Sequence, residues 1–187
     1  MSQNIVKFIS TFDKTKETSR SCNFESVVYI PASLQASYPD GVNSLRMRCE
    51  ASELPSRNFS TVDQKTYGPV QTFPVQNFYD KINLVFICSG DMQEKQFFDR
   101  WMNYISVSTR TSSVNNDRLL FDFEYRNNYT TSIEILQYDL AGNLSYVVKL
   151  QEVYPIAVNA ISLSWDATNR INKLPVTFSY RYFDIPN

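Results

Sequence analysis

The side chains that most often carry catalysis are scarce in this 187-residue sequence, which contains no histidine. Histidine is the usual general base near neutral pH, a frequent metal ligand, and the partner of serine or cysteine nucleophiles, so all of these roles are excluded. The acidic residues Asp122 and Glu124 alternate along a segment with strand character and have no marked partner. We therefore expect no catalytic residues, and the chain is predicted not to be an enzyme.

The three cysteines also lack a pattern that is associated with chemistry. Cys22, Cys49 and Cys88 stand at unrelated spacings and form no Cys-x-x-Cys pair, so no zinc site is expected. With only four glycines, the chain has no glycine-rich loop for a phosphate group. The sequence thus predicts neither a metal nor a cofactor.

The charge balance is close to neutral, with 18 Lys and Arg against 19 Asp and Glu. This disfavours a basic nucleic-acid-binding protein. Tyr180, Arg181 and Tyr182 have the composition of a stacking platform for single-stranded nucleic acid, although a C-terminal core strand with one polar face explains them better. No apolar run approaches the ~20 residues of a membrane span. Because the N-terminus does not resemble a signal peptide, we expect a soluble protein made in a reducing cytoplasm.

The elements that must position these residues are predicted to be mostly strands. Aromatic residues make up 14% of the chain, and they favour half-buried pleated surfaces. The pattern indicates a mainly β fold, an antiparallel β-sandwich or small barrel with one flanking α-helix. Its strands are expected at residues 23–31, 45–50, 68–74, 82–88, 133–140, 144–152, 156–165 and 176–182.

The flanking helix is predicted at residues 92–105. Asp91 stands three residues before Glu94, a capping-box spacing with Asp91 as the N-cap. The apolar residues recur at helical spacing and are expected to pack against the sheet as core. These core-helix residues are Phe97, Phe98, Trp101 and Ile105.

The length favours a single domain at residues 23–187, preceded by an N-terminal arm at residues 1–22. Polar stretches at residues 51–67 and 106–131 interrupt the strand pattern. Residues 51–67 are predicted to be a long loop, and loops of such length in a compact domain are usually either functional or disordered. Aromatic strands, long polar loops and the lack of reactive groups favour a protein that assembles with copies of itself.

Several short segments form an ordered combination that is more specific than any one of them. Cys-Glu-Ala-Ser-Glu-Leu-Pro at residues 49–55 and Phe-Phe-Asp-Arg-Trp-Met at residues 97–102 are the most informative, and Val-Tyr-Pro-Ile follows at residues 153–156. Together they resemble the tail tube proteins of contractile-tailed bacteriophages, over residues 23–184. The family commonly has glycine after Leu-Pro, where this chain has Ser56.

This resemblance implies a structural virion protein of the phage tail tube, assembled in the host cytoplasm. Family members have a β-sandwich-like fold, join into hexameric rings, and stack into a hollow tube that conducts DNA inside a contractile sheath. The implied partners are copies of the chain itself, the sheath protein, a baseplate tube initiator, a tape measure protein and a tail terminator. DNA is expected to pass through the lumen without specific binding, because a conduit that held phosphates would retain its cargo.

The resemblance also identifies residues 51–67 with the family's extended loop, which reaches the adjacent ring. It assigns inter-ring contacts to Glu53, Leu54, Pro55, Arg57 and Phe59. A disordered surface loop is the alternative explanation of the same residues, and we favour the contact. Three other functions stay open: a tube-initiating baseplate protein, a tube protein of a bacterial contractile, type VI-like injection system, and an enzyme that uses carboxylates alone. Initiators often carry an additional domain, for which this chain has no room.

Overall fold

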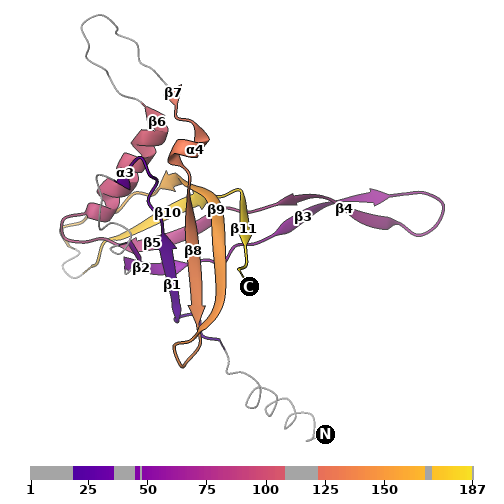
Figure 1. Ribbon diagram of the computed structural model, residues 1–187, viewed down its shortest axis with the longest axis horizontal. Coiled ribbons are helices and arrows are strands. Elements are labelled where there is room, and N and C mark those ends of the chain that lie inside the picture. The colour runs from indigo at the N-terminus through magenta and orange to yellow at the C-terminus, as the bar shows by residue number, and fades with distance from the viewer. Residues whose placement is uncertain (1–18, 36–44, 47, 108–121, 167–169, 187) are drawn as a thin grey trace, which may run out of the picture.

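A computed structural model of the chain describes residues 19–35, 45–46, 48–107, 122–166 and 170–186. Most of its strands form one antiparallel sheet with the order β1-β8-β9-β10-β5-β2, and β11 pairs with β9 (Figure 1). These strands are β1 (Phe24–Val28), β2 (Cys49–Ser52), β5 (Ile82–Ile87), β8 (Thr131–Tyr138), β9 (Leu144–Val158), β10 (Lys173–Ser179) and β11 (Tyr182–Asp184). The remaining elements are β3 (Asn58–Gln64), β4 (Gln71–Phe78), β6 (Ser106–Val107), β7 (Asp122–Phe123), α3 (Gln93–Ile105) and α4 (Arg126–Tyr129).

Strand β9 joins the two halves of the sheet and changes direction at Glu152. Its first part pairs with β8 and β11, and its last part pairs with β10. Glu152 has a φ of 53°, a left-handed conformation that costs about 1–3 kcal/mol for a residue other than glycine. Its carboxylate accepts hydrogen bonds from Arg126 Nε at 2.8 Å and Arg181 Nη1 at 2.7 Å, and the Arg181 bond lowers the pKa of Glu152. Two guanidinium groups from other elements thus hold the bend in place.

The two halves of the sheet share one hydrophobic core. In β10 every second residue is buried, as expected for a strand with one face toward the core. The strands contribute Val28, Ile82, Leu84, Phe86, Ile133, Ile135, Val148, Leu150, Val153, Leu174, Val176 and Phe178 to this core. The predicted fold class is therefore confirmed: the protein is mainly β with antiparallel sheets, although it has a second, short helix.

Helix α3 covers this core with its aromatic side chains. The Phe98 ring centroid lies 5.1 Å from that of Phe86 and 5.9 Å from that of Phe178. Trp101 is completely buried, and its indole N–H donates a hydrogen bond to the carbonyl of Tyr129 at 2.9 Å. The structure buries each residue of the predicted apolar stripe, namely Phe97, Phe98, Trp101 and Ile105.

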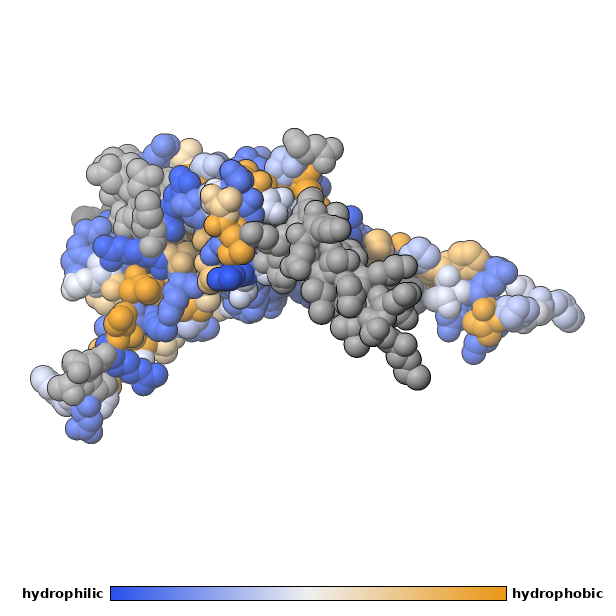
Figure 2. Space-filling model, turned by 90° about the horizontal axis from the view of Figure 1, so that it is seen from below, coloured by the Kyte–Doolittle hydropathy of each residue, from blue (hydrophilic) through white to orange (hydrophobic). Residues whose placement is uncertain are grey.

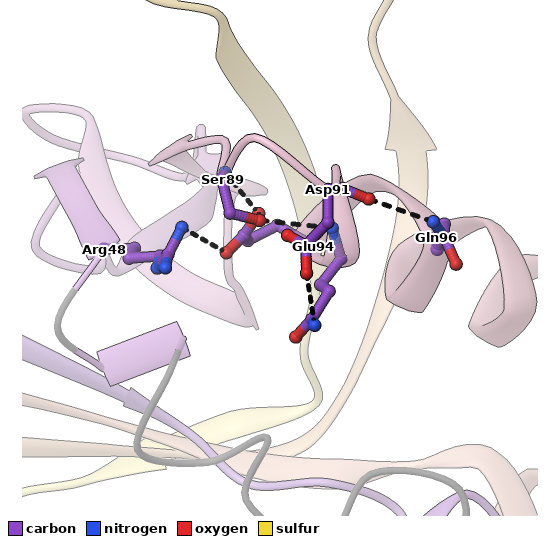
Figure 3. A network of polar contacts seen from close by, with 6 residues as sticks. Arg48, Ser89, Asp91, Glu94 and Gln96 are labelled. Carbon is purple, nitrogen blue, oxygen red and sulfur yellow. Dashed lines mark hydrogen bonds and ion pairs between the residues drawn. The ribbon is translucent and has the colours of Figure 1, made fainter.

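The start of α3 differs from the predicted capping box. The N-cap residue is Met92, with a φ of 55° and no side-chain capping bond, so Asp91 is not the cap. Ser89 takes its place: its hydroxyl accepts a hydrogen bond from the Gln93 N–H at 3.3 Å, and its own N–H and O–H both donate to Glu94 Oε2 at 2.8 Å (Figure 3). The reciprocal capping therefore spans five residues instead of three, because the chain turns once more before the helix begins.

Glu94 also links the helix to the segment before β2. Its side chain is only 2% exposed, and Arg48 Nη1 lies 3.0 Å from Glu94 Oε1 (Figure 3). The two side chains form an ion pair, but no N–H of Arg48 points at Glu94 Oε1 well enough for a hydrogen bond. The charge of Glu94 is therefore compensated, while Oε1 accepts no hydrogen bond. Breaking such a pair from one side leaves a buried charge uncompensated.

Three predicted segments have different secondary structure. Residues 45 and 46 are helical rather than extended, and β2 begins only at Cys49. Strand β9 ends at Val158, so the strand predicted at 156–165 stops early. Residues 58–64, which were expected in a loop, form strand β3.

The N-terminal arm predicted at residues 1–22 lies outside the described residues except for 19–22, and so do residues 108–121 of the polar segment. The described end of that segment contains helix α4. None of the described helices has the length and apolar character needed to span a membrane. Among the described residues there is also no group of three His, Cys, Asp or Glu residues arranged for a metal ion.

Candidate assembly interface

Strands β3 and β4 form a hairpin, residues 58–78, that extends away from the rest of the molecule (Figure 1). We refer to it as the arm. Its ladder runs from the pair Asn58–Phe78 to the pair Gln64–Gln71, and residues 65–70 form the tip. No residue of the arm is buried. Because an isolated two-stranded hairpin is at best marginally stable in water, the arm is expected to need a partner.

The arm exposes apolar side chains along most of its length. Figure 2 shows them as hydrophobic patches between hydrophilic residues on the projecting part of the molecule. Single exposed apolar residues are ordinary, whereas a contiguous series on an element without a core marks a contact surface. The series consists of Phe59, Val62, Tyr67, Val70, Phe73, Val75 and Phe78, which are between 44% and 110% exposed.

A β-bulge determines which of these side chains share a face. The register shifts between Ser60 and Thr61, and Val75 is the extra residue on β4. In a regular strand, Phe73 and Phe78 would lie on opposite faces because they are five positions apart. The bulge places both on the same face as Val62, which pairs with Phe73. One face of the arm thus collects three apolar side chains.

Aromatic contacts fix the base of the arm to the body. The Arg57 guanidinium lies 4.9 Å from the centroid of the Phe183 ring in β11. The Tyr79 ring at the other strand's end lies 5.5 Å from Phe183 and 5.8 Å from Tyr180. These contacts hold both strands where they leave the sheet, so the direction of the arm is set by the body.

Hydrogen bonds reinforce the same junction. Asp80 accepts bonds from the Ser56 hydroxyl at 2.8 Å and the Asn58 amide at 2.5 Å, which link the two strands at their origin. The Tyr180 hydroxyl donates to the Ser56 carbonyl at 3.4 Å, and burial raises the pKa of Tyr180 to about 12. The hydroxyl and the carbonyl of Ser56 therefore both contribute to this junction.

The five residues predicted for inter-ring contact fall into two groups. Glu53 accepts hydrogen bonds from the backbone and side-chain N–H groups of Asn83 at 3.1 Å and 3.3 Å, and Arg57 lies over Phe183, so both are engaged within their own chain. Leu54 and Phe59 are 54% and 58% exposed, and Pro55 is half-buried.

The second strand of the arm was predicted only in part, because the strand signal at residues 68–74 covers the first half of β4. Val75 and Phe78 lie beyond that signal, where the bulge makes the spacing of apolar residues irregular.

The remaining candidate groups have structural surroundings. Tyr180 is buried, and the exposed Arg181 pairs with Glu152, so of the two tyrosines only Tyr182 is exposed and these three residues do not form a stacking platform. Glu124 accepts a hydrogen bond from Asn128 within its own segment. Burial raises the pKa of the Cys49 thiol to about 11 and also raises that of Cys88, which leaves both thiols protonated and poor nucleophiles at neutral pH.

The sequence matches the family model described as phage tail tube protein over residues 8–185. No protein in the curated collection of sequences matches it. A chain from the sheath/tube terminator of an extracellular contractile injection system, PVC, in its extended state aligns with a TM-score of 0.63 and 12% identity, over 92% of this chain and 99% of that one.

Two further solved structures are similar. A chain from the baseplate of the anti-feeding prophage has a TM-score of 0.62 and 10% identity, over 92% of this chain and 97% of that one. A chain from the PVC sheath-tube complex has a TM-score of 0.61 and 13% identity, over 95% of this chain and 96% of that one. At such identities the likeness shows a shared fold.

Proposed function

The chain belongs to the phage tail tube protein family, and from this membership we propose that it forms stacked hexameric rings of a contractile tail. The rings make a hollow tube that is enclosed by the sheath and conducts DNA into the host. The observation that carries the proposal is the arm, a projecting hairpin with exposed apolar side chains and no buried residue of its own.

The arm supplies the contact between successive rings in this proposal. Burying one phenylalanine side chain completely is worth about 1.5–3 kcal/mol. In a ring of identical copies each arm makes the same contact, whereas the entropy of docking one ring on the next is lost only once. Modest burial for each arm therefore adds up to strong stacking.

The residues at the junction have two different roles. Glu53 and Arg57 hold the base of the arm on the body, through Asn83 and Phe183. Leu54, Pro55 and Phe59 belong to the contact surface in this proposal, and of the three only Phe59 lies within the arm. A base that is fixed before assembly reduces the conformational entropy that stacking would otherwise cost.

The proposed partners are further copies of the chain, the sheath, a baseplate initiator, a tape measure protein and a terminator. The similar solved structures, which come from a sheath-tube complex, a baseplate and a terminator, support tubes of this kind. The net charge of -1 supports a lumen through which DNA passes without being held. In this role the protein is part of the assembled particle.

A second candidate is the tube protein or tube initiator of a contractile injection system that does not carry DNA. It is favoured by the similar folds in PVC and in the anti-feeding prophage. The two functions differ in cargo, so nuclease protection of DNA inside purified particles that contain this chain distinguishes them.

Electron microscopy of the purified protein tests the tube directly. The concentrated protein, alone and seeded on isolated baseplates, is expected to give hollow filaments with six-fold symmetric averages. Rings that never stack, even on baseplates, would favour an initiator. Monomers under all of these conditions would contradict assembly by this chain.

A further inference from the structure

The end of the molecule opposite the arm carries a second group of exposed apolar side chains. Leu163, Trp165 and Ile171 belong to the connection between β9 and β10 and are 80%, 102% and 60% exposed. A hollow of about 570 Å³ opens beside them, lined by residues 160–162, residues 170–173 and Pro175. A neighbouring hollow of about 440 Å³ extends it past Leu163 and Trp165. We refer to the two together as the loop hollow.

The strand register places the loop hollow and the arm at opposite ends of the same strand pair. Lys173, which lines the hollow, pairs with Ile87 at the end of β5, whereas Phe178 pairs with Ile82 at its start. The arm ends at Phe78, just before β5 begins. In Figure 1 the arm accordingly extends to the right, while the end of β5 that borders the hollow lies on the left.

The two ends also carry complementary unpaired charges. Asp63 is the only acidic residue of the arm; its carboxylate accepts a hydrogen bond from the Thr72 hydroxyl at 2.9 Å, and it has no cationic partner in the described part of the chain. In the hollow, Lys173 is paired with Glu50, but Arg170 has no partner among the described residues. Opposite charges of this kind fix the register of an interface and exclude wrong pairings.

We propose that the loop hollow of one copy receives the arm tip of a second copy of this chain, with Asp63 of the arm facing Arg170 of the hollow. The apolar side chains Tyr67 and Val70 of the tip are buried against the exposed side chains that border the hollow. The inference rests on the proposed function, in which the arm contacts another copy, and it adds the surface that the arm contacts.

Such a contact has a consequence for growth. The donor and acceptor surfaces are different and lie at opposite ends, so the contact is heterologous and each added copy presents a new free acceptor. Successive layers therefore add without limit along one axis. A self-complementary contact, by contrast, would stop at two layers.

A charge reversal tests the pairing in the full-length protein. Asp63→Arg and Arg170→Asp are each expected to raise the concentration required for tube formation at least about tenfold, and the double variant is expected to return toward the unaltered value. Asp63→Arg combined with Lys173→Asp is the matched control and should not recover. Recovery in that control, or single variants that assemble normally, would contradict the Asp63–Arg170 pairing.

Mixing two defective variants tests whether the two surfaces meet. One variant has residues 60–76 replaced by Asn-Gly and keeps only the hollow; the other, Leu163→Asp with Trp165→Asp, keeps only the arm. Neither is expected to form tubes alone, but the mixture should give complexes of two layers by sedimentation and electron microscopy. Because Leu163 and Trp165 are exposed, the second variant should melt like the unaltered protein.

The outcomes separate this inference from the proposed function. If the shortened arm abolishes tubes but the mixture shows no two-layer complex, the arm binds elsewhere and the inference is wrong while the proposed function stands. If the unaltered protein forms no tubes even on baseplates, the proposed function fails, and the inference fails with it.

Discussion

Strands in the body and strands in the arm have the same kind of backbone ladder, but they differ in what covers their faces. In β5 the side chains of Ile82, Leu84 and Phe86 are at most 2% exposed, and each packs into the shared core. In β3 and β4 no side chain is buried, although seven residue pairs are in register. Backbone pairing alone gives little net stability. The body is thus stabilised by its own core, whereas the arm has exposed faces that a partner could cover.

The largest loss of stability is expected when the body loses its central aromatic side chain. Trp101→Ala removes a fully buried indole and the bond to the Tyr129 carbonyl, so the free energy of unfolding should fall by about 3–5 kcal/mol. Chemical denaturation measures this change. Trp165→Ala is the matched control, because that indole is completely exposed and its loss should change the value by less than about 0.5 kcal/mol. An equal loss of unfolding free energy in both variants would contradict the burial of Trp101 and the exposure of Trp165.

The next largest effect is expected at the buried carboxylate that begins α3. Glu94→Ala leaves the Ser89 N–H and O–H without their acceptor and Arg48 without its ion pair, which should cost about 1–3 kcal/mol. Thermal unfolding measures the loss. Lys95→Ala, which removes a partly exposed pair with Asp99 one turn along the same helix, is the control and should cost well under that amount. An unchanged melting temperature of Glu94→Ala would show that the network in Figure 3 does not stabilise the fold.

A smaller, pH-dependent effect is expected at Glu25. Its carboxylate accepts hydrogen bonds from Arg46 and from the Tyr138 hydroxyl, and the Arg46 bond holds the pKa of Glu25 below its usual 4.5. A lowered carboxyl pKa stabilises the fold above pH 4.5, and this contribution is lost as the pH falls through the lowered value. Because Arg46 is 38% exposed, we expect no more than about 1 kcal/mol.

Denaturation at several pH values tests this contribution. Glu25→Gln should lower the stability at neutral pH and flatten its decline between pH 5 and the acid range. The same slope in both proteins would rule out this carboxylate as a source of the pH dependence.

The smallest effect on the isolated chain is expected in the arm. Phe73→Ser removes an exposed ring, so the monomer should unfold within about 0.5 kcal/mol of the unaltered protein. Tube formation, followed by light scattering, should nevertheless need a higher concentration. Phe178→Ser, a buried ring in β10, is the body counterpart and should destabilise the monomer strongly. If Phe73→Ser destabilised the monomer as well, the arm would have intrachain packing that the structure does not show.

The sequence predicted the body better than the arm for a physical reason. A strand such as β10 or a helix such as α3 has one buried face, and burial imposes a period of two residues or of three to four. The arm has no buried face in the monomer, and its bulge at Val75 shifts the spacing of Phe73 and Phe78. Residues 51–67 showed no period because β3 has no buried face, and they were interpreted as a loop.

Local competition explains the other differences. Asp91 and Glu94 have the spacing of a capping box, but Ser89 offers both a hydroxyl and a backbone N–H to Glu94. The alternation at residues 45–50 suggested a strand, whereas Leu45 is buried from a helical turn and Arg46 reaches Glu25. The contact of Arg46 with Glu25 joins residues 21 positions apart, so no local pattern records it.

The most direct test of the central claim is the assembly state of the chain whose arm is shortened by replacing residues 60–76 with Asn-Gly. The shortened chain should keep the melting temperature of the unaltered protein, since the arm contributes nothing to the core. It should form rings or monomers but no tubes by sedimentation velocity and electron microscopy, even when it is seeded on baseplates. Normal tubes from this variant would contradict the assignment of the arm as the contact between rings.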